Sequence, residues 1–568
     1  GVPPLVGIDT RHFPSICDTF HRHAARSLRR DAISPSRRSL LADRDVRTVN
    51  PSTALRTGGR LLWERSASVI PVYLLASGLY GVARVPFLVA GLLAVWFLGT
   101  TGRLDPFVDV LRETGAGPGS VSPDPAEVER IAPDLGEAVA GLLTPETVAL
   151  LLAGGLLSLL LALLASAVGG AAAIGGLYGL LRGEDGVRAA VDGARRYWRS
   201  ILGVRLLLLA ALAGVGLPLV GFFAAVGGFV TTTMAAASST GTTRSWAVLG
   251  LAVLLGLFAL LVGALLVAGV YVLFAFAEQA VVVDDVGTVA AVRRSVRFPF
   301  RRPWDALGYV AVAFGALVVS GAVGSSAAAF GATRVTALVG AVLLPPVVDG
   351  FKTSLYAERE LPSDAELARP EERLRAAFVG GLRAVGGFVR GHPAANLASL
   401  GVFAAGGLVG WRATSSFGLS LPIGGDVANV FGSFPLGTFF NLAVNNWLVA
   451  ADLAYSGLAV GVPAVVGLGF NGIVVGAVGG VFDPVAFVAL VAPHGVVEIP
   501  AIVVGGALGL WLGGVVLGVV RRRGHGDDVA AAIREAYRVL LGLVPLFVLA
   551  AFIEAFLTPA IASLVLGG

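Results

Sequence analysis

Long apolar runs recur along most of this chain, and short polar or charged segments separate them. About 20 apolar residues are enough for a helix to cross the hydrocarbon core of a bilayer. The pattern predicts about eleven membrane-spanning helices in two blocks, namely 67–99, 147–169, 202–230, 247–275, 306–329 and 335–351, then 394–411, 433–451, 453–481, 496–520 and 537–557. The run at 433–451 supports a crossing least strongly. We therefore expect an all-α, polytopic integral membrane protein.

Two segments lack this pattern and divide the chain. Residues 1–60 contain several arginines without a sustained apolar period. We expect a basic, disordered cytoplasmic tail there, and a basic arm that binds anionic lipid is the alternative. Residues 356–392 are charged and helix-prone, which predicts a cytoplasmic linker. The expected organisation is an N-terminal membrane module of about six helices at 61–355 and a C-terminal module of about five at 393–568.

Loop charges predict how the helices are oriented. The segment 101–146 contains nine acidic residues and only three arginines, whereas 182–205, 293–302, 369–390 and 521–523 are rich in arginine. Positively charged loops of membrane proteins lie in the cytoplasm, and the predicted crossings place all four arginine-rich segments on that side. This predicts a multi-pass protein of the cell membrane with a cytoplasmic N-terminus and an external C-terminus.

Composition supports the membrane class and narrows the chemistry. Hydrophobic residues make up 56% of the 568 residues and charged residues only 14%, against about 25% charged residues in soluble proteins. Cys17 is the single cysteine, which excludes an internal disulfide and a cysteine-based zinc site. The net charge of +5 is attributed to cytoplasmic loops rather than to nucleic-acid binding. The expected partners are the lipid bilayer and other membrane or envelope proteins, with no cofactor.

The first block contains a weak internal repeat. Residues 186–199 and 287–301 share a Gly-x-x-Ala-Ala-Val hexapeptide followed by closely spaced arginines. Such segments suit interfacial amphipathic helices, and we interpret them either as elbows of membrane hairpins or as a duplicated hairpin of the kind found in many transport folds. The block also looks somewhat like the membrane domain associated with glycerophosphodiester phosphodiesterases, although it carries no catalytic motif.

The strongest candidate site lies in the second block, where Pro493, His494, Gly495, Glu498 and Pro500 interrupt an apolar run. Ionisable side chains are costly in hydrocarbon, so each one there is a functional-site hypothesis. His494 and Glu498 share a face if this segment is helical, whereas Gly495 and Pro500 favour a broken or re-entrant element. The candidate partners are the other polar residues of the apolar runs, Asn441, Asn445, Asn446, Asn471 and Glu554.

Three hypotheses describe this polar set: a hydrogen-bonded core that fixes helix register, a site that binds or conducts an ion, proton or small solute, and a metal-dependent intramembrane enzyme. The enzyme hypothesis is the weakest, because His494 is the only histidine near these runs and catalytic zinc normally has three protein ligands including histidines. The His-Glu-x-x-His, Gly-x-Ser-x-Gly and P-loop motifs are also absent. We therefore expect no enzymatic activity, and no catalytic, cofactor-binding or metal-binding residue.

Glycines recur at every fourth position in two of the apolar runs. A stripe of glycines on one helix face lets another helix approach closely inside a membrane, where no hydrophobic force drives helices together. We therefore expect helix packing at Gly472, Gly476, Gly480, Gly505, Gly509 and Gly513.

Several short motifs carry a resemblance to a known family. They are Phe439-Phe440-Asn441 with Asn445, Ser456-Gly457, Phe470-Asn471-Gly472, Pro493-His494-Gly495 with Glu498 and Pro500-Ala501-Ile502, and Ile553-Glu554-Ala555-Phe556. From about residue 390 to its end, the chain resembles the stage II sporulation protein M family.

This resemblance implies a helical membrane module of about five spans. In spore-forming bacteria such a protein is a membrane anchor of the engulfment machinery, beside cell-wall hydrolases. The expected function is a non-enzymatic membrane scaffold or envelope-remodelling component. The alternative is a transporter or channel for an ion or small solute that uses the His, Glu and Asn cluster.

Overall fold

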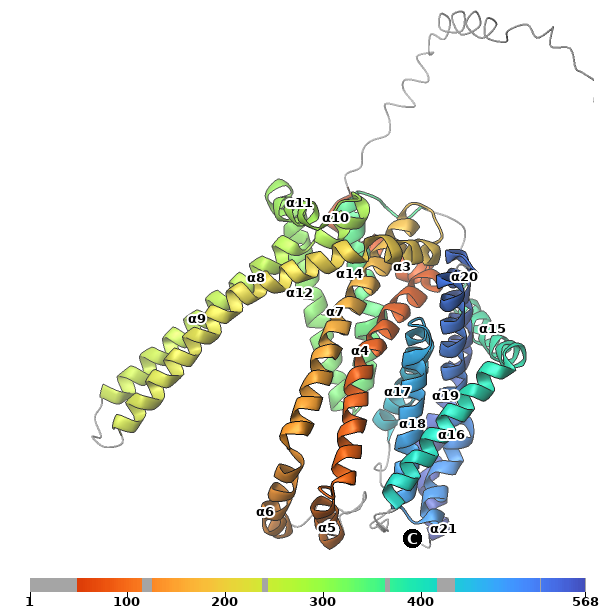
Figure 1. Ribbon diagram of the computed structural model, residues 1–568. Helices are drawn as coiled ribbons and strands as arrows, with labels where there is room; N and C mark the ends of the chain where they lie inside the picture. Colours follow the sequence, from red (N-terminus) through yellow and green to blue (C-terminus); the bar gives the residue numbers. More distant parts are fainter. Residues whose placement is uncertain are drawn as a thin grey trace, which may run out of the picture. The chain divides into compact units, whose positions relative to one another are not determined.

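The computed structural model describes residues 49–114, 125–237, 244–362, 368–415, 435–521 and 523–566, and these ranges contain helices and no β-strand. The first helices are α3 (Pro51–Glu64), α4 (Ser66–Thr100), α5 (Asp105–Thr114), α6 (Pro125–Leu142), α7 (Pro145–Leu181), α8 (Gly186–Ala237), α9 (Arg244–Phe274), α10 (Ala277–Val283), α11 (Thr288–Arg301), α12 (Pro303–Ala329), α13 (Thr333–Leu338), the π-helical turn η1 (Val339–Leu343) and α14 (Leu344–Ala357) (Figure 1). They are followed by α15 (Pro370–Gly391), α16 (Pro393–Ser415), α17 (Leu436–Ser456), α18 (Val462–Val481), α19 (Pro484–Val520), α20 (Gly526–Phe552), the π-helical turn η3 (Ile553–Leu557) and α21 (Thr558–Leu566).

Ten helical stretches within the described ranges are long and apolar enough to cross a bilayer, which confirms the predicted all-α polytopic membrane fold. They are Ser66–Thr100, Pro145–Leu181, Gly186–Ala235, Val248–Val283, Pro303–Ala329, Thr333–Ala357, Pro393–Ser415, Val462–Val481, Pro484–Val520 and Gly526–Leu566. Each coincides with one of the predicted crossings. The remaining prediction, 433–451, forms helix α17, which is not among the ten. Three asparagines and an aspartate reduce its hydropathy.

The two copies of the weak repeat both lie in helices. Residues 186–199 form the first turns of α8, which has 52 residues, and 287–301 correspond to α11 with its N-cap Gly287. At 1.5 Å per residue, α8 is about 78 Å long, whereas the hydrocarbon core of a bilayer is about 30 Å thick. The membrane therefore holds only part of α8, and its arginine-rich first turns are free to lie outside the hydrocarbon.

The predicted tail at 1–60 is wrong at its C-terminal end, because α3 begins at Pro51. The side chain of Asn50 accepts a hydrogen bond from the Thr53 N–H at 2.9 Å and caps the helix. Arg60 donates to Glu64 at 2.7 Å, and this hydrogen bond holds the pKa of Glu64 below its ordinary value. α3 packs against α14, where any side chain at Gly58 would collide with backbone. Residues 1–48 of the predicted tail lie outside the described residues.

The predicted crossing at 453–481 is interrupted near its start. α17 ends at Ser456, and α18 begins only at Val462. Within the connection, Val460 and Gly461 have φ angles of 60° and 79°, a left-handed conformation that a β-branched residue rarely adopts. Pro463 then lies in the first turn of α18, where its missing N–H costs no helical hydrogen bond.

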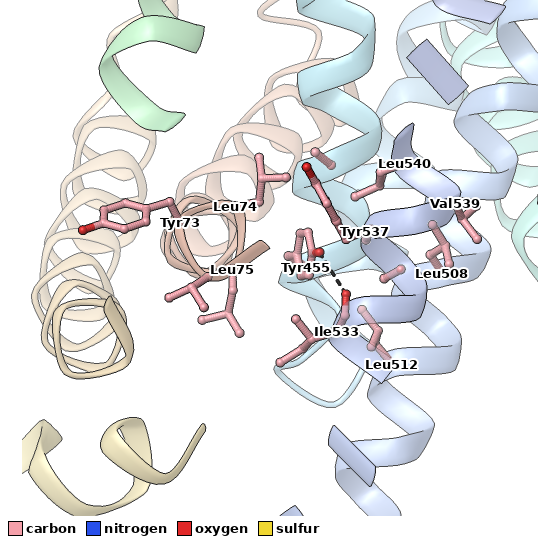
Figure 2. Packing of buried hydrophobic residues seen from close by; sticks show 14 of the residues in the cluster. Tyr73, Leu74, Leu75, Tyr455, Leu508, Leu512, Ile533, Tyr537, Val539 and Leu540 are labelled. Carbon is pink, nitrogen blue, oxygen red and sulfur yellow. Dashed lines mark hydrogen bonds between the residues drawn. The ribbon is translucent and has the colours of Figure 1, made fainter. Parts of the chain in front are cut away.

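The main hydrophobic core joins helices from both sides of the predicted linker. Leu74 of α4, Tyr455 of α17, Leu508 of α19 and Leu540 of α20 are all buried in it (Figure 2). The Tyr455 hydroxyl donates a hydrogen bond to the Ile533 carbonyl of α20 at 3.2 Å. α4 precedes residues 356–392 and the other three helices follow them, so one continuous core contains both parts of the chain.

The buried Tyr455 gives a prediction about stability. Tyr455→Phe is expected to lower the free energy of unfolding by about 1 kcal/mol, because one buried hydrogen bond is lost. Tyr455→Ala should lower it by about 3–5 kcal/mol, because a fully buried ring leaves a cavity. Unfolding in mixed micelles with increasing SDS measures both values. Tyr271 on α9 is 50% exposed, and Tyr271→Phe should have no effect. Equal losses for Tyr455→Phe and Tyr271→Phe would contradict the prediction.

Candidate functional site

α19 carries the polar segment of the sequence in one uninterrupted helix of 37 residues, with Pro493 and Pro500 inside it. The side chain of Asp483 starts this helix by accepting hydrogen bonds from the Val485 and Ala486 N–H groups at 2.9 and 3.1 Å. Of the two predicted alternatives, the structure therefore has the continuous helix and not the broken or re-entrant element.

His494 and Glu498 lie one turn apart on α19 and therefore share a face. His494 is about 15 Å along the helix from its first residue, and its side chain is 14% exposed. The Nδ1 atom of His494 and the Oε2 atom of Glu498 are buried without a hydrogen-bond partner among the described residues. Buried polar atoms nearly always have a partner, so these two atoms require an explanation.

Glu554 comes from the last membrane-spanning stretch, in the π-helical turn η3. Pro559 follows this turn, and a proline ring clashes with the carbonyl four residues before it, here that of Ala555. A wider π-helical turn relieves such a clash, and η1 likewise precedes Pro345 and Pro346. π-Helical turns within α-helices are frequent at functional sites.

Three side chains that can bind cations meet at this place. One ligand atom from each of His494, Glu498 and Glu554 lies within 4.8 Å of the other two, and His494 Nε2 is 4.0 Å from Glu554 Oε2. Among the described residues, no arginine or lysine forms an ion pair with any of the three. Two carboxyl groups in apolar surroundings are both ionised only at high cost unless a positive charge joins them. This arrangement can hold a metal ion or another cation.

The predicted asparagine partners have their observed hydrogen bonds elsewhere. Asn441 of α17 donates to the Gly331 carbonyl at 2.8 Å and accepts from the Arg334 N–H at 2.7 Å, so it binds the turn between α12 and α13. Asn471 donates to the Gly467 carbonyl of its own helix at 2.8 Å. Asn445 donates to Asn446 at 3.0 Å. Among the described residues, none of these hydrogen bonds involves His494 or Glu498, whereas Glu554 lies together with both of them.

The predicted glycine stripes lie at close helix contacts. In the first stripe, a Cβ atom at any position would approach α16 more closely than van der Waals contact, and in the second stripe it would do so toward α17, α18 or the turn between them. The positions concerned are Gly472, Gly476, Gly480, Gly505, Gly509 and Gly513. The second stripe is on α19 and thus fixes how the helix of His494 and Glu498 packs.

A second polar cluster, which was not predicted from the sequence, joins α4 and α17. Arg84 of α4 forms an ion pair with Asp452 of α17 at 3.1 Å, and the Ser77 hydroxyl donates to Asp452 at 3.4 Å. The pair borders a cavity of about 240 Å³, also lined by Ser456 and Asn471. Arg84 and Asp452 each lie as an isolated charge within an apolar segment of the sequence, and this pattern could have identified both as candidate site residues.

Comparisons with known proteins assign part of the chain. Residues 399–559 match the family described as Stage II sporulation protein M, which confirms the predicted resemblance and includes His494, Glu498 and Glu554. The C-terminal part of this multi-pass membrane protein is thus similar to the stage II sporulation protein M family. No curated protein and no solved structure matches the chain.

Proposed function

We propose that this protein binds a cation inside the membrane and moves it across, with His494, Glu498 and Glu554 forming the binding site. The observation that carries this proposal is the meeting of the three side chains, from two membrane-spanning stretches, within 4.8 Å. Intramembrane ionisable residues commonly mark ion pathways and proton relays.

The hydrogen bonds favour this function over a purely structural polar core. A structural core is expected to satisfy its buried polar atoms, as Asn441 does with two hydrogen bonds. By contrast, His494 and Glu498 each keep a buried atom without a partner among the described residues. Side chains that lie close together without bonding to one another can bind a cation between them. A cation also neutralises the two carboxylates, which face no described arginine or lysine.

A membrane scaffold is the second candidate, because the match to Stage II sporulation protein M covers most of the C-terminal part. The surface of α9 supports it. This helix contacts mainly α8 and α11, and large apolar side chains such as Leu254, Phe258 and Leu265 are more than half exposed. Such a surface accommodates either lipid or the helix of a partner. Site-specific photocrosslinking at Phe258 tests this candidate, and crosslinks to lipid alone would count against it.

Cation uptake into proteoliposomes tests the transport proposal. The full chain would be reconstituted and offered H⁺, Na⁺, K⁺, Mg²⁺, Mn²⁺ and Zn²⁺ gradients. Glu498→Gln keeps the size of the side chain but removes its charge, and it is expected to reduce uptake of the transported cation at least tenfold. Glu535→Gln is the control, because Glu535 lies on α20 with a side chain that is 41% exposed.

The folded state of each variant would be verified by its unfolding temperature in detergent. Uptake lost in Glu498→Gln and retained in Glu535→Gln supports transport through the site. The proposal fails if the wild-type protein moves none of these cations, or if folded Glu498→Gln protein transports as well as the wild type does.

A further inference from the structure

We propose that the cation held by His494, Glu498 and Glu554 is a divalent first-row transition metal ion, such as Zn²⁺ or Fe²⁺. This inference rests on the proposed function only for the presence of a cation site. It names the chemical class of the ion, with one histidine nitrogen and one oxygen from each carboxylate as the ligands.

The distances fit such an ion after a small movement. Zinc bonds to histidine nitrogen and carboxylate oxygen are about 2.0–2.2 Å long, which places the ligand atoms of a tetrahedral site about 3.4 Å apart. His494 Nε2 and Glu554 Oε2 are 4.0 Å apart, and no pair among the three ligand atoms exceeds 4.8 Å. Closing the largest gap requires an approach of about 1.4 Å to the tetrahedral spacing, which is within the reach of rotation about the bonds of a glutamate side chain.

The donor atoms and the charge select the class of metal. Imidazole nitrogen suits zinc, iron, copper and nickel, whereas magnesium and calcium prefer sites made of oxygen ligands alone. Two ionised carboxylates beside a neutral imidazole carry a charge of −2, and the described residues contribute no arginine or lysine to balance it. A divalent ion neutralises this charge, whereas a single monovalent ion leaves one net negative charge inside the membrane.

The surroundings indicate a site that exchanges its metal. Three protein ligands leave one position of a tetrahedral ion open, unlike structural zinc sites, which are closed by four. A metal-bound histidine usually donates its second ring N–H to an acceptor, and loss of that acceptor weakens metal affinity about 10- to 100-fold. Nδ1 of His494 has no such partner among the described residues. Weaker binding and an open position both suit an ion that must leave again.

Metal binding to the purified full chain in nanodiscs tests the inference. After treatment with a chelator, equilibrium dialysis against Zn²⁺, with or without a large excess of Mg²⁺, would measure the bound metal. We expect one zinc ion that Mg²⁺ does not displace. His494→Gln and Glu554→Gln should weaken its binding by more than about 100-fold. His392→Gln is the control, because the His392 ring stacks on Phe388 and lies tilted against Trp511, which is three turns or more beyond Glu498 on α19.

Co²⁺ gives a readout that general misfolding does not imitate. Bound at this site in the wild-type protein, it should show the visible absorption of a four- or five-coordinate ion, and added Zn²⁺ should abolish it. Zinc binding that Mg²⁺ displaces equally well, or that persists in both His494→Gln and Glu554→Gln, overturns the inference. Uptake of H⁺ or Na⁺ that requires Glu498 without metal binding also overturns it but leaves transport standing. Metal binding without uptake of any cation would support this inference and contradict the transport proposal.

Discussion

Asp452→Leu is expected to lower the free energy of unfolding by about 3 kcal/mol, because it leaves the guanidinium group of Arg84 without its counter-charge inside the membrane. Arg84 lies near the middle of the 35-residue helix α4, beside a groove lined almost entirely by apolar side chains of α4 and α7. Its ion pair with Asp452 spans 3.1 Å, and its side chain is 67% exposed, which in this apolar part of α4 is exposure to lipid rather than to water. An unpaired arginine there must either remain in hydrocarbon or distort the helix packing to reach water.

A double-mutant cycle separates the ion pair from simple packing changes. Arg84→Leu alone should also destabilise the protein, since among the described residues Asp452 then keeps only the Ser77 hydroxyl as a partner. The combined variant is expected to recover most of the loss, because replacing both members of an ion pair in apolar surroundings with apolar residues is often close to neutral.

The control for this cycle is the pair of Arg188 and Asp527, which lies in the first turns of α8 and α20, outside the predicted membrane crossings. Asp527→Leu should cost less than about 1 kcal/mol. Unfolding in SDS mixed micelles measures all four variants. If Asp452→Leu and Asp527→Leu have equal effects, Arg84 is solvated by water and the intramembrane ion pair does not exist.

The apolar runs were sufficient to predict the membrane helices, because each crossing must bury about 20 residues in lipid regardless of its tertiary contacts. The boundaries were less predictable. The run from 453 to 481 gives no polar signal at the break between α17 and α18, where Val460 and Gly461 adopt positive φ angles. Hydropathy reports the polarity of side chains and contains no information about backbone conformation. Gly461 and Pro463 were the available signals, since glycine tolerates positive φ and proline favours the first turn of a helix.

The candidate site was predictable in part for the same reason. The spacing of His494 and Glu498 places them on one face of any helix. Glu554 was predicted as their partner because it is a carboxylate within another apolar run. The asparagines were poor indicators of the site, because an amide can satisfy its hydrogen bonds on nearby backbone, as Asn471 does on the Gly467 carbonyl one turn earlier in its own helix. Sequence spacing cannot distinguish such local satisfaction from a distant partner.

Gly476→Ala is expected to lower the free energy of unfolding by at least about 2 kcal/mol, although the same change in an exposed helix normally stabilises by roughly 0.5–1 kcal/mol. The Cβ atom of an alanine at position 476 would overlap the backbone of Gly407 on α16. A backbone atom cannot rotate away as the end of a side chain can. α16 and α18 would therefore separate and lose the close contact on which their association inside a membrane depends.

Gly401→Ala on α16 is the control, because the same substitution is expected there to leave the free energy of unfolding unchanged or to raise it slightly. No atom lies within 4 Å of a Cβ atom built at Gly401, so only the gain in helix propensity remains and the variant should be neutral or slightly more stable. Both variants would be compared by unfolding in SDS mixed micelles and by size-exclusion chromatography after heating. If Gly476→Ala is as stable as Gly401→Ala, α16 and α18 are not in backbone contact, and the glycine stripe has another role.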